Sequence, residues 1–226
     1  MEIFLPTTCC FGTPFVYTLL TLKKALMSGT IPGFVDVVLN FGSTRFQGDN
    51  LIDQWSKNDR NLTMYGDDTW LKLFPDRFMR YDGTSSFFVA DFTEVDDNVT
   101  RHLDSEMDKN DWDVCVLHYL GLDHIGHLTG PKDPRIGPKL DEMGQVVEFL
   151  KNRLIHEKKW ILPPLIIVLG DHGMADAGGH GGSSEAEIQT PMLFITPLNL
   201  TRKSRNVKQV DLAPTLAWLT GVPIPM

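Results

Sequence analysis

Aspartate and histidine residues gather in two short strings whose side chains suit a divalent metal ion. The strings are LDHIGH at residues 122–127 and GDHGM at residues 170–174, and a further histidine stands between glycines at position 180. Carboxylate oxygens and imidazole nitrogens are typical ligands of zinc and related ions. The candidate ligands are therefore Asp123, His127, Asp171, His172 and His180.

The spacing of these residues indicates phosphoryl chemistry. Asp123 and His127 stand four residues apart, so a single turn brings both to one ion, and Gly126 lets the backbone bend there. Asp171 and His172 are adjacent, so on an extended segment they point to opposite sides and serve two ions, unless an irregular turn brings them to one. Two ions about 4 Å apart clamp a phosphoryl group and stabilise both the attacking and the leaving oxygen. We therefore predict two divalent ions, zinc by ligand type, and phosphoryl or phosphodiester transfer.

Other residues near the strings leave two interpretations open. A single Asp-His pair is as often a hydrogen-bonded turn as a pair of ligands, and only the whole set favours a metal site. His118 lies in an expected strand and is interpreted as a core histidine, whereas His124 faces either the substrate or the metal ligands. Asp68 and Trp70, in the string YGDDTW, either line a substrate crevice or belong to a plain turn.

Short apolar runs alternate with helical patterns along the chain. The runs predict strands at 62–65, 86–91, 114–119, 165–169 and 192–196, as in a parallel sheet buried on both faces. Apolar residues at helical spacing predict helices at 95–107, 137–156 and 210–219. We expect one α/β domain with a doubly wound, mostly parallel sheet and helices on both faces. Ligands bind at the carboxyl ends of such strands, where each string leaves its strand and enters a loop.

Composition narrows the function further. The chain of 226 residues has a net charge of −8 and one locally basic stretch, at 202–205, which argues against a nucleic-acid partner. Its three cysteines are an odd number, so no disulfide framework is implied. No stretch after residue 22 is apolar for long enough to predict a membrane span. Asn-x-Thr sequons make Asn61, Asn98 and Asn199 candidate N-glycosylation sites, which favours a secretory lumen.

Longer blocks of the sequence resemble a known family. HYLGLDHIGHLTGP, followed by GDHGM, is similar to the alkaline-phosphatase superfamily, in particular to its GPI ethanolamine phosphate transferases and most of all to those acting on the second mannose. Four more blocks occur in the same order: ALMSGTIPGFVDVV, YGDDTWLKLFP, YDGTSSFFVADFTEVDDNVTRHLD and VDLAPTLAWLTGVPIP. The resemblance covers residues 24–226. We expect a divergent segment at 1–23 and a partial, alkaline-phosphatase-like catalytic domain at 24–226 that lacks the family's first strand.

The resemblance implies a division of the ligands between two zinc ions. Asp123, His127 and His180 correspond to the ligands of one ion. Asp171 and His172 correspond to part of the other site, which in the family also includes an aspartate near the amino terminus and a threonine nucleophile. One site is therefore expected to be nearly complete and the other impaired.

The nucleophile is not identified by the resemblance. The family carries its threonine in a Thr-Met-Pro-Arg type of segment, and an ungapped comparison puts Leu19 at that position. Thr18 and Thr21 are the neighbouring threonines that a shifted alignment would bring there.

The resemblance also implies a reaction and a setting. Ethanolamine phosphate passes from phosphatidylethanolamine to the threonine and then to a mannose of the GPI anchor precursor. The setting is the endoplasmic reticulum membrane, with the catalytic domain in the lumen and a possible membrane partner subunit. Because the family's amino-terminal anchor and membrane-spanning carboxyl-terminal region are missing here, we expect a chain shortened at both ends. Two alternatives stay open, a catalytically impaired metal-binding fragment and a metal-dependent phosphodiesterase of the same superfamily.

Overall fold

The computed structural model describes residues 5–8, 19–30, 45–157, 161–199 and 204–226. The strands are β1 (Leu5–Thr8), β2 (Leu62–Asp67), β3 (Arg80–Thr84), β4 (Val114–His118), β5 (Ile166–Leu169) and β6 (Gln189–Ile195). The α-helices are α1 (Leu19–Ser28), α3 (Leu51–Lys57), α4 (Thr69–Leu73), α5 (Glu94–Met107), α6 (Gly121–Thr129), α7 (Ile136–Lys151), α8 (Glu185–Ile188) and α9 (Leu212–Thr220). A π-helical turn, η1 (Asn152–His156), extends α7, and a 3-10 turn, η2 (Gln209–Asp211), precedes α9.

β2 stands at the centre of a parallel sheet with the strand order β3-β2-β4. All its residues are buried. Met64 pairs with Tyr81 of β3 and with Val116 of β4, and both neighbouring strands run in the same direction as β2. The predicted strands at 62–65 and 114–119 and their parallel arrangement are thereby confirmed.

β6 lies between β1 and β5 and runs antiparallel to both. The predicted strands at 165–169 and 192–196 are confirmed, but they do not pair in parallel. A parallel return needs a long crossover, usually a helix, and the residues between β5 and β6 contain only the four-residue helix α8. β1 has the sequence LPTT and contains no carboxylate, and the absence of the family's first strand stays a prediction.

The predicted strand at 86–91 is wrong. The edge strand next to β2 is β3, and residues 85–93 form irregular turns. Phe87 and Phe88 are 82% and 69% exposed. Their apolar side chains favour a strand, but β propensity depends on packing against neighbours, and these two side chains stay largely exposed to solvent. β3, and not the run at 86–91, forms backbone hydrogen bonds with β2.

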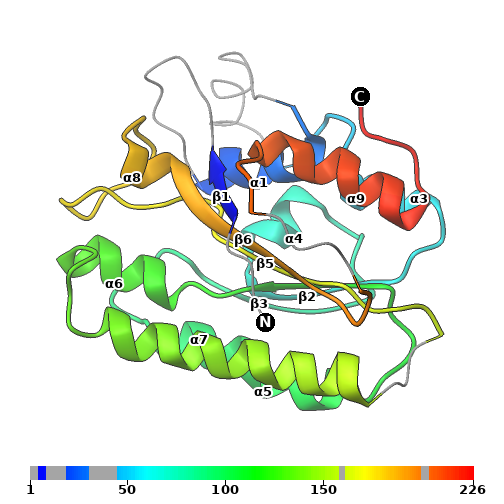
Figure 1. The fold of residues 1–226 in the computed structure, drawn as a ribbon, viewed down its shortest axis with the longest axis horizontal. Helices are drawn as coiled ribbons and strands as arrows, with labels where there is room; N and C mark the ends of the chain where they lie inside the picture. The colour runs from blue at the N-terminus through cyan, green and yellow to red at the C-terminus, as the bar shows by residue number, and fades with distance from the viewer. Residues whose placement is uncertain (1–4, 9–18, 31–44, 158–160, 200–203) are drawn as a thin grey trace.

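Two hydrophobic clusters lie on opposite faces of the strands, so the molecule has three layers. In Figure 1, α1, α4 and α9 lie above the strands, and α5 and α7 lie below them. β5 contributes to both clusters in alternation, with Ile167 and Leu169 on the upper face and Ile166 and Val168 on the lower. β4 alternates in the same way, so the parallel and antiparallel sheets form one middle layer. Helices on both faces, as expected, are confirmed.

The predicted helices at 95–107, 137–156 and 210–219 are confirmed as α5, α7 with η1, and α9. α1 runs across the expected boundary between residues 23 and 24, and that division stays a prediction. Within the described parts of the chain, no helix combines the length and the apolar character needed to cross a membrane.

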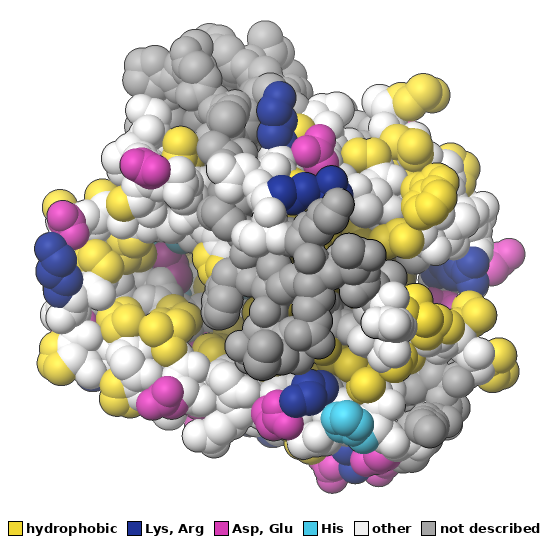
Figure 2. All heavy atoms as spheres, in the orientation of Figure 1, with side chains coloured by type: hydrophobic (Ala, Val, Ile, Leu, Met, Phe, Trp, Pro, Cys, Tyr) yellow, Lys and Arg dark blue, Asp and Glu magenta, His cyan; other side chains and the backbone are white. Residues whose placement is uncertain are grey.

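Apolar side chains remain exposed on α9 and on the residues after it, where Figure 2 shows hydrophobic side chains gathered. Trp218 and Met226 are 76% and 98% exposed, and Leu219 and Ile224 are also exposed. Exposed apolar groups of this kind often mark a contact surface. None of the described residues covers this face.

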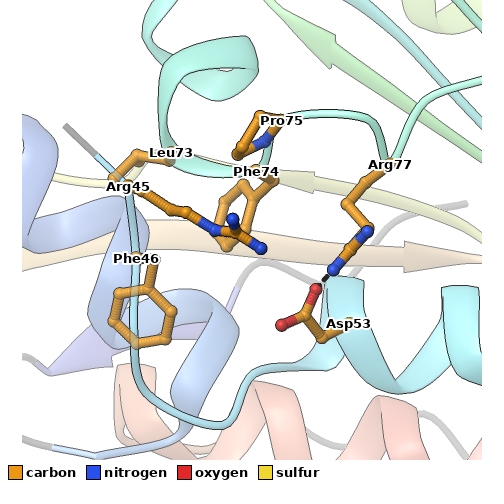
Figure 3. Close-up of a pocket in the computed structure, with 7 residues that line it drawn as sticks. All are labelled: Arg45, Phe46, Asp53, Leu73, Phe74, Pro75 and Arg77. Carbon is orange, nitrogen blue, oxygen red and sulfur yellow. Dashed lines mark hydrogen bonds and ion pairs between the residues drawn. The ribbon is translucent and has the colours of Figure 1, made fainter.

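A cavity beside α3 and α4 is too small to hold a substrate. It has a volume of about 10 Å³ and is lined by the seven residues of Figure 3. An ion pair closes one side, with Arg77 Nε 2.5 Å from Asp53 Oδ1. A volume of this size holds about one water molecule. The cavity contains none of the candidate metal ligands.

Candidate metal centre

Helix α6 begins directly after β4 and carries the first string. The expected loop at 121–127 is therefore wrong, and the i, i+4 spacing of a helix is what places Asp123 and His127 side by side. Gly126 does not bend the backbone. A Cβ atom at this position would lie 2.1 Å from Met174 Sδ, so the glycine admits the methionine of the second string against α6. The two strings are packed together at this contact.

The second string lies on the loop after β5, and hydrogen bonds between its backbone groups and neighbouring segments hold it in place. The Gly170 N–H donates to the Pro191 carbonyl at 3.2 Å, and Gln209 Nε2 donates to the Asp171 carbonyl at 2.8 Å. The partners belong to β6 and η2, so the antiparallel part of the fold positions this loop.

The three candidate histidines converge on Asp123, and Asp171 adjoins one of them. The Asp123 Oδ1 atom lies 3.4 Å from His127 Nε2, and 3.8 Å from Nε2 of both His172 and His180. His172 Nε2 also lies 3.8 Å from Asp171 Oδ1. Ligand atoms around a tetrahedral zinc ion with bonds of about 2.0–2.2 Å lie about 3.3–3.6 Å apart, so these separations need only small adjustments.

The ligands form one connected group, not two separate sets. Ligand atoms of Asp123, His172 and His180 lie within 4.8 Å of one another. His172, which the resemblance assigns with Asp171 to the second ion, therefore lies between the two carboxylates. The other two candidates each contact one member of this trio. His127 contacts Asp123, and Asp171 contacts His172.

Several polar atoms of this group are buried without a hydrogen-bond partner, which fits a site built for a cation. They are Asp123 Oδ1, Asp171 Oδ2 and His180 Nδ1. His172 Nδ1 donates to the Gly173 carbonyl at 2.9 Å, which leaves the lone pair of its Nε2 directed to the carboxylates. Burial, reinforced by the neighbouring His172, lowers the pKa of His180, so its imidazole is neutral at neutral pH. Neutral imidazoles and unpartnered carboxylate oxygens are what a divalent ion requires.

A second buried cluster lies at the carboxyl ends of β2 and β4. Lys23 of α1 forms an ion pair with Asp67 and a hydrogen bond with Thr69, and the side chains of Lys23 and Asp67 are 1% and 0% exposed. The Thr69 hydroxyl donates to Asp67 Oδ2 at 2.6 Å. His118 Nδ1 lies 3.8 Å from the same oxygen.

Electrostatic interactions join the second cluster to the metal centre. The pKa of His118 is lowered to about 4, first by burial and then by the Lys23 ammonium, against the opposing effect of Asp171. Burial also lowers the pKa of Lys23, although Asp67 and Asp171 act in the opposite direction. Burial alone would raise the pKa of Asp67, but Lys23 outweighs it and holds that pKa below its usual range. Asp171 therefore acts on both clusters.

Two residues predicted to lie on the substrate side have other partners. His124 is 1% exposed, and its Nδ1 donates to the Asp91 carbonyl, so it ties α6 to the turn before α5. Asp68, which directly precedes α4, is partly exposed and forms an ion pair with Lys72 of that helix at 2.7 Å. Neither belongs to the group of metal ligands.

Trp70, the third such residue, belongs to the second cluster. It is buried, and its ring meets the ring of His118 edge-on. Sequence reasoning missed Asp67, two residues beyond the strand predicted at 62–65, and set His118 aside within the strand predicted at 114–119. In the structure they end β2 and β4, the kind of position that had pointed to the candidate metal ligands. Lys23 carried no such signal, because only the packing of α1 brings it to this edge.

The remaining predicted residues have few described contacts. Thr18 lies outside the described residues, and Thr21 lies on α1 in a part whose side chains are not described. Asn61 Nδ2 donates to the Asp111 carbonyl at 2.7 Å, and Asn199 is exposed.

Comparisons with known proteins show which family the chain is similar to. A sequence model described as type I phosphodiesterase / nucleotide pyrophosphatase matches residues 43–187. The chain is 49% identical over 209 residues to GPI ethanolamine phosphate transferase 2, catalytic subunit, of Homo sapiens. It is 45% identical over 242 residues and 43% identical over 240 residues to GPI ethanolamine phosphate transferase 2 of Aspergillus oryzae and Candida albicans. These alignments cover 89%, 98% and 98% of this chain but 21%, 28% and 26% of the relatives, so the chain spans less than a third of their length.

A solved structure shows the same fold. The lipoteichoic acid synthase LtaP from Listeria monocytogenes superposes with a TM-score of 0.60 at 12% identity, covering 98% of this chain and 64% of that one. At this identity the likeness concerns the fold alone, and it confirms the expected alkaline-phosphatase-like α/β architecture. The match over residues 43–187 takes in more than half of the chain and all five candidate ligands, and the chain therefore belongs to the type I phosphodiesterase / nucleotide pyrophosphatase family.

Proposed function

We propose that this chain carries the catalytic part of a GPI ethanolamine phosphate transferase. The reaction transfers ethanolamine phosphate from phosphatidylethanolamine to a mannose of the GPI anchor precursor. The observation that carries the proposal is the convergence of Asp123, His172 and His180 within 4.8 Å. Similarity to transferases of that name over nearly the whole chain supports the substrate class.

The five converging side chains are proposed as ligands of two zinc ions. Asp123, His127 and His180 would hold one ion, and Asp171 and His172 would contribute to the other. Bound there, divalent ions would supply Lewis-acid stabilisation of charge on the phosphoryl oxygens. His172 Nε2 lies 3.8 Å from Oδ1 of both carboxylates, so it is placed to serve either ion.

A threonine near the start of α1 is the proposed nucleophile, either Thr18 or Thr21. Its oxygen bonds to phosphorus while the diacylglycerol oxygen leaves, which gives an ethanolamine-phosphate ester on the threonine. A mannose hydroxyl then attacks the same phosphorus and releases the threonine. A covalent step of this kind divides one difficult displacement into two easier ones.

The proposed setting is the lumen of the endoplasmic reticulum, at its membrane. Three sequons support a lumenal domain, and both substrates are lipids. The human relative is named as a catalytic subunit, which supports a partner subunit in the membrane.

One experiment tests the transferase and its alternatives together. The purified chain is loaded with zinc, its metal content is measured, and it is incubated with ethanolamine-labelled phosphatidylethanolamine and a mannosylated GPI precursor. Label on the mannose that disappears in Asp123→Asn, but not in the exposed control Asp141→Asn, supports the transferase. Absence of label on the mannose refutes it for this chain.

The phosphodiesterase alternative is favoured by the family description of residues 43–187. It predicts that the label is released to water as free ethanolamine phosphate. Bound zinc without either product would instead identify an impaired metal-binding fragment.

A further inference from the structure

The Lys23 ammonium is buried in a setting that suits a small organic cation. Three groups surround it, the Asp67 carboxylate, the Thr69 hydroxyl and the Trp70 ring, whose centroid lies 5.9 Å from Nζ. The cation cage is defined here as Asp67, Thr69, Trp70 and His118. Its members come from the carboxyl ends of β2 and β4 and from the start of α4.

The cage offers the acceptors that a primary ammonium group requires. Such a group has three N–H donors, and Asp67 and Thr69 accept two of them from Lys23. His118 Nδ1 is buried without a hydrogen-bond partner and lies 3.8 Å from Asp67 Oδ2, so it is placed as a third acceptor. Its imidazole is neutral at neutral pH, because the pKa of His118 is lowered to about 4. The Trp70 ring adds a cation–π contact.

A purely structural role explains this arrangement poorly. A buried ion pair is often no more stabilising than apolar residues of the same volume, because both charges lose their water. The cage moreover leaves His118 Nδ1 and Trp70 Nε1 without partners, and each unpartnered buried group is a cost to stability. A ligand that offers both hydrogen-bond donors and acceptors satisfies such groups.

We propose that the cation cage is a binding site for a primary ammonium group, and that Lys23 fills it in this chain with its own ammonium. Resting on the proposed function, the ligand is the ammonium of ethanolamine phosphate. The cage lies next to the metal centre along the chain, since His118 ends β4 and α6, which carries Asp123, begins at Gly121. Lys23 competes with this ligand intramolecularly, so removal of this side chain frees the cage.

The test is ligand binding to Lys23→Ala in the full chain, measured calorimetrically after chelation of metals. Ethanolamine and glycerophosphoethanolamine represent the free amine and the lipid headgroup. Choline is the control, because its quaternary nitrogen has no N–H donor. Lys23→Ala is expected to bind ethanolamine at least about tenfold more tightly than the unmodified chain, the ratio for one hydrogen bond to a buried charge. The surface variant Lys132→Ala, whose lysine pairs with Asp176, is expected to behave like the unmodified chain.

A second variant shows whether the cage is responsible. Adding Asp67→Asn to Lys23→Ala is expected to abolish the gained affinity. Equal binding by Lys23→Ala and the unmodified chain, binding of choline as tight as that of ethanolamine, or binding that survives Asp67→Asn would each overturn the proposal. If Lys23→Ala does not fold alone, refolding in ethanolamine but not in choline supports the cage, and failure in both overturns it.

The outcome is separable from that of the transfer assay, because binding is measured without metal and without turnover. Ammonium binding in a chain that transfers nothing would refute the proposed function and leave the site in place. If Lys23→Ala gains affinity for both ligands but binds glycerophosphoethanolamine more tightly than ethanolamine, the site is assigned to the lipid headgroup.

Discussion

Asp123 Oδ1 lies 3.8 Å from His172 Nε2, although the two residues follow different strands, β4 and β5. The carboxylate oxygen has no hydrogen-bond partner, and the histidine is fixed through its other nitrogen to the Gly173 carbonyl. Neither string can assemble this contact alone. It depends on the packing of the second string against α6, where Gly126 leaves room for Met174.

Loss of the Asp123 carboxylate should therefore destroy metal binding. Asp123→Asn removes the charge that faces three imidazoles, and zinc affinity should fall by more than about 100-fold, beyond the effect of losing an outer partner of a ligand. Competition with a chromogenic chelator measures this. Asp141→Asn, an exposed change on α7, is the control and should bind zinc normally. Retained affinity in Asp123→Asn would contradict the assignment.

Substitution of Gly66 tests the close approach of β2 and β4. Gly66 has φ +128°, and a Cβ atom there would lie 2.1 Å from the His118 carbonyl oxygen. Gly66→Ala should lower the free energy of unfolding by about 3 kcal/mol or more, because backbone strain adds to a clash with backbone of β4. Denaturant titration measures it.

The matched control is Gly144→Ala, in the middle of α7. A Cβ atom there meets nothing within 4 Å, so alanine should stabilise the chain by about 0.5–1 kcal/mol. Equal effects of the two substitutions would show that β2 and β4 do not approach each other as described.

Glu106 should make stability depend on acid pH. Burial alone would raise the pKa of this carboxyl, but hydrogen bonds from Arg80 and Tyr65 outweigh it and hold the pKa below its usual range. The unfolded chain then takes up the proton first as the pH falls. The stabilisation is present above the ordinary carboxyl pKa of about 4.3 and is lost as the pH falls through the folded value.

Glu106→Gln should accordingly lower stability at pH 7 and flatten its decline below about pH 5. Unfolding free energies measured at a series of pH values test this. Glu185→Gln, an exposed change on α8, should leave the slope unchanged. An unaltered slope in Glu106→Gln would mean that the carboxylate contributes nothing there.

The sequons give a test of the lumenal setting. Asn199 is exposed, whereas Asn98 Nδ2 donates to Asp82 Oδ2 at 3.1 Å and its Oδ1 is buried without a partner. In cells with a secretory pathway, Asn199→Gln should lose the mass of one glycan, and Asn98→Gln should change mobility least. Mass shifts after glycosidase treatment measure both. No glycan on any of the three asparagines would contradict a lumenal domain.

The amino-acid sequence alone determined the candidate metal ligands as a set and most of the elements that carry them. Apolar runs marked β2, β4, β5 and β6, because buried strands leave a continuous pattern whatever they pair with. For the same reason these runs did not determine the direction in which neighbouring strands pair, and β6 proved antiparallel to β5. The run at 86–91 misled, since an apolar pattern records hydrophobicity and not whether a surface exists to cover it.

Only the tertiary structure decided which ligands meet. His172 lies between Asp123 and Asp171 because α6 and the loop after β5 pack at Gly126, a contact between segments distant in sequence. The pairing of Lys23 with Asp67 is likewise invisible in the sequence, where a lysine on an amphipathic helix is expected to face water. Residue types fix what chemistry is available, and the packing of distant segments fixes which groups share a site.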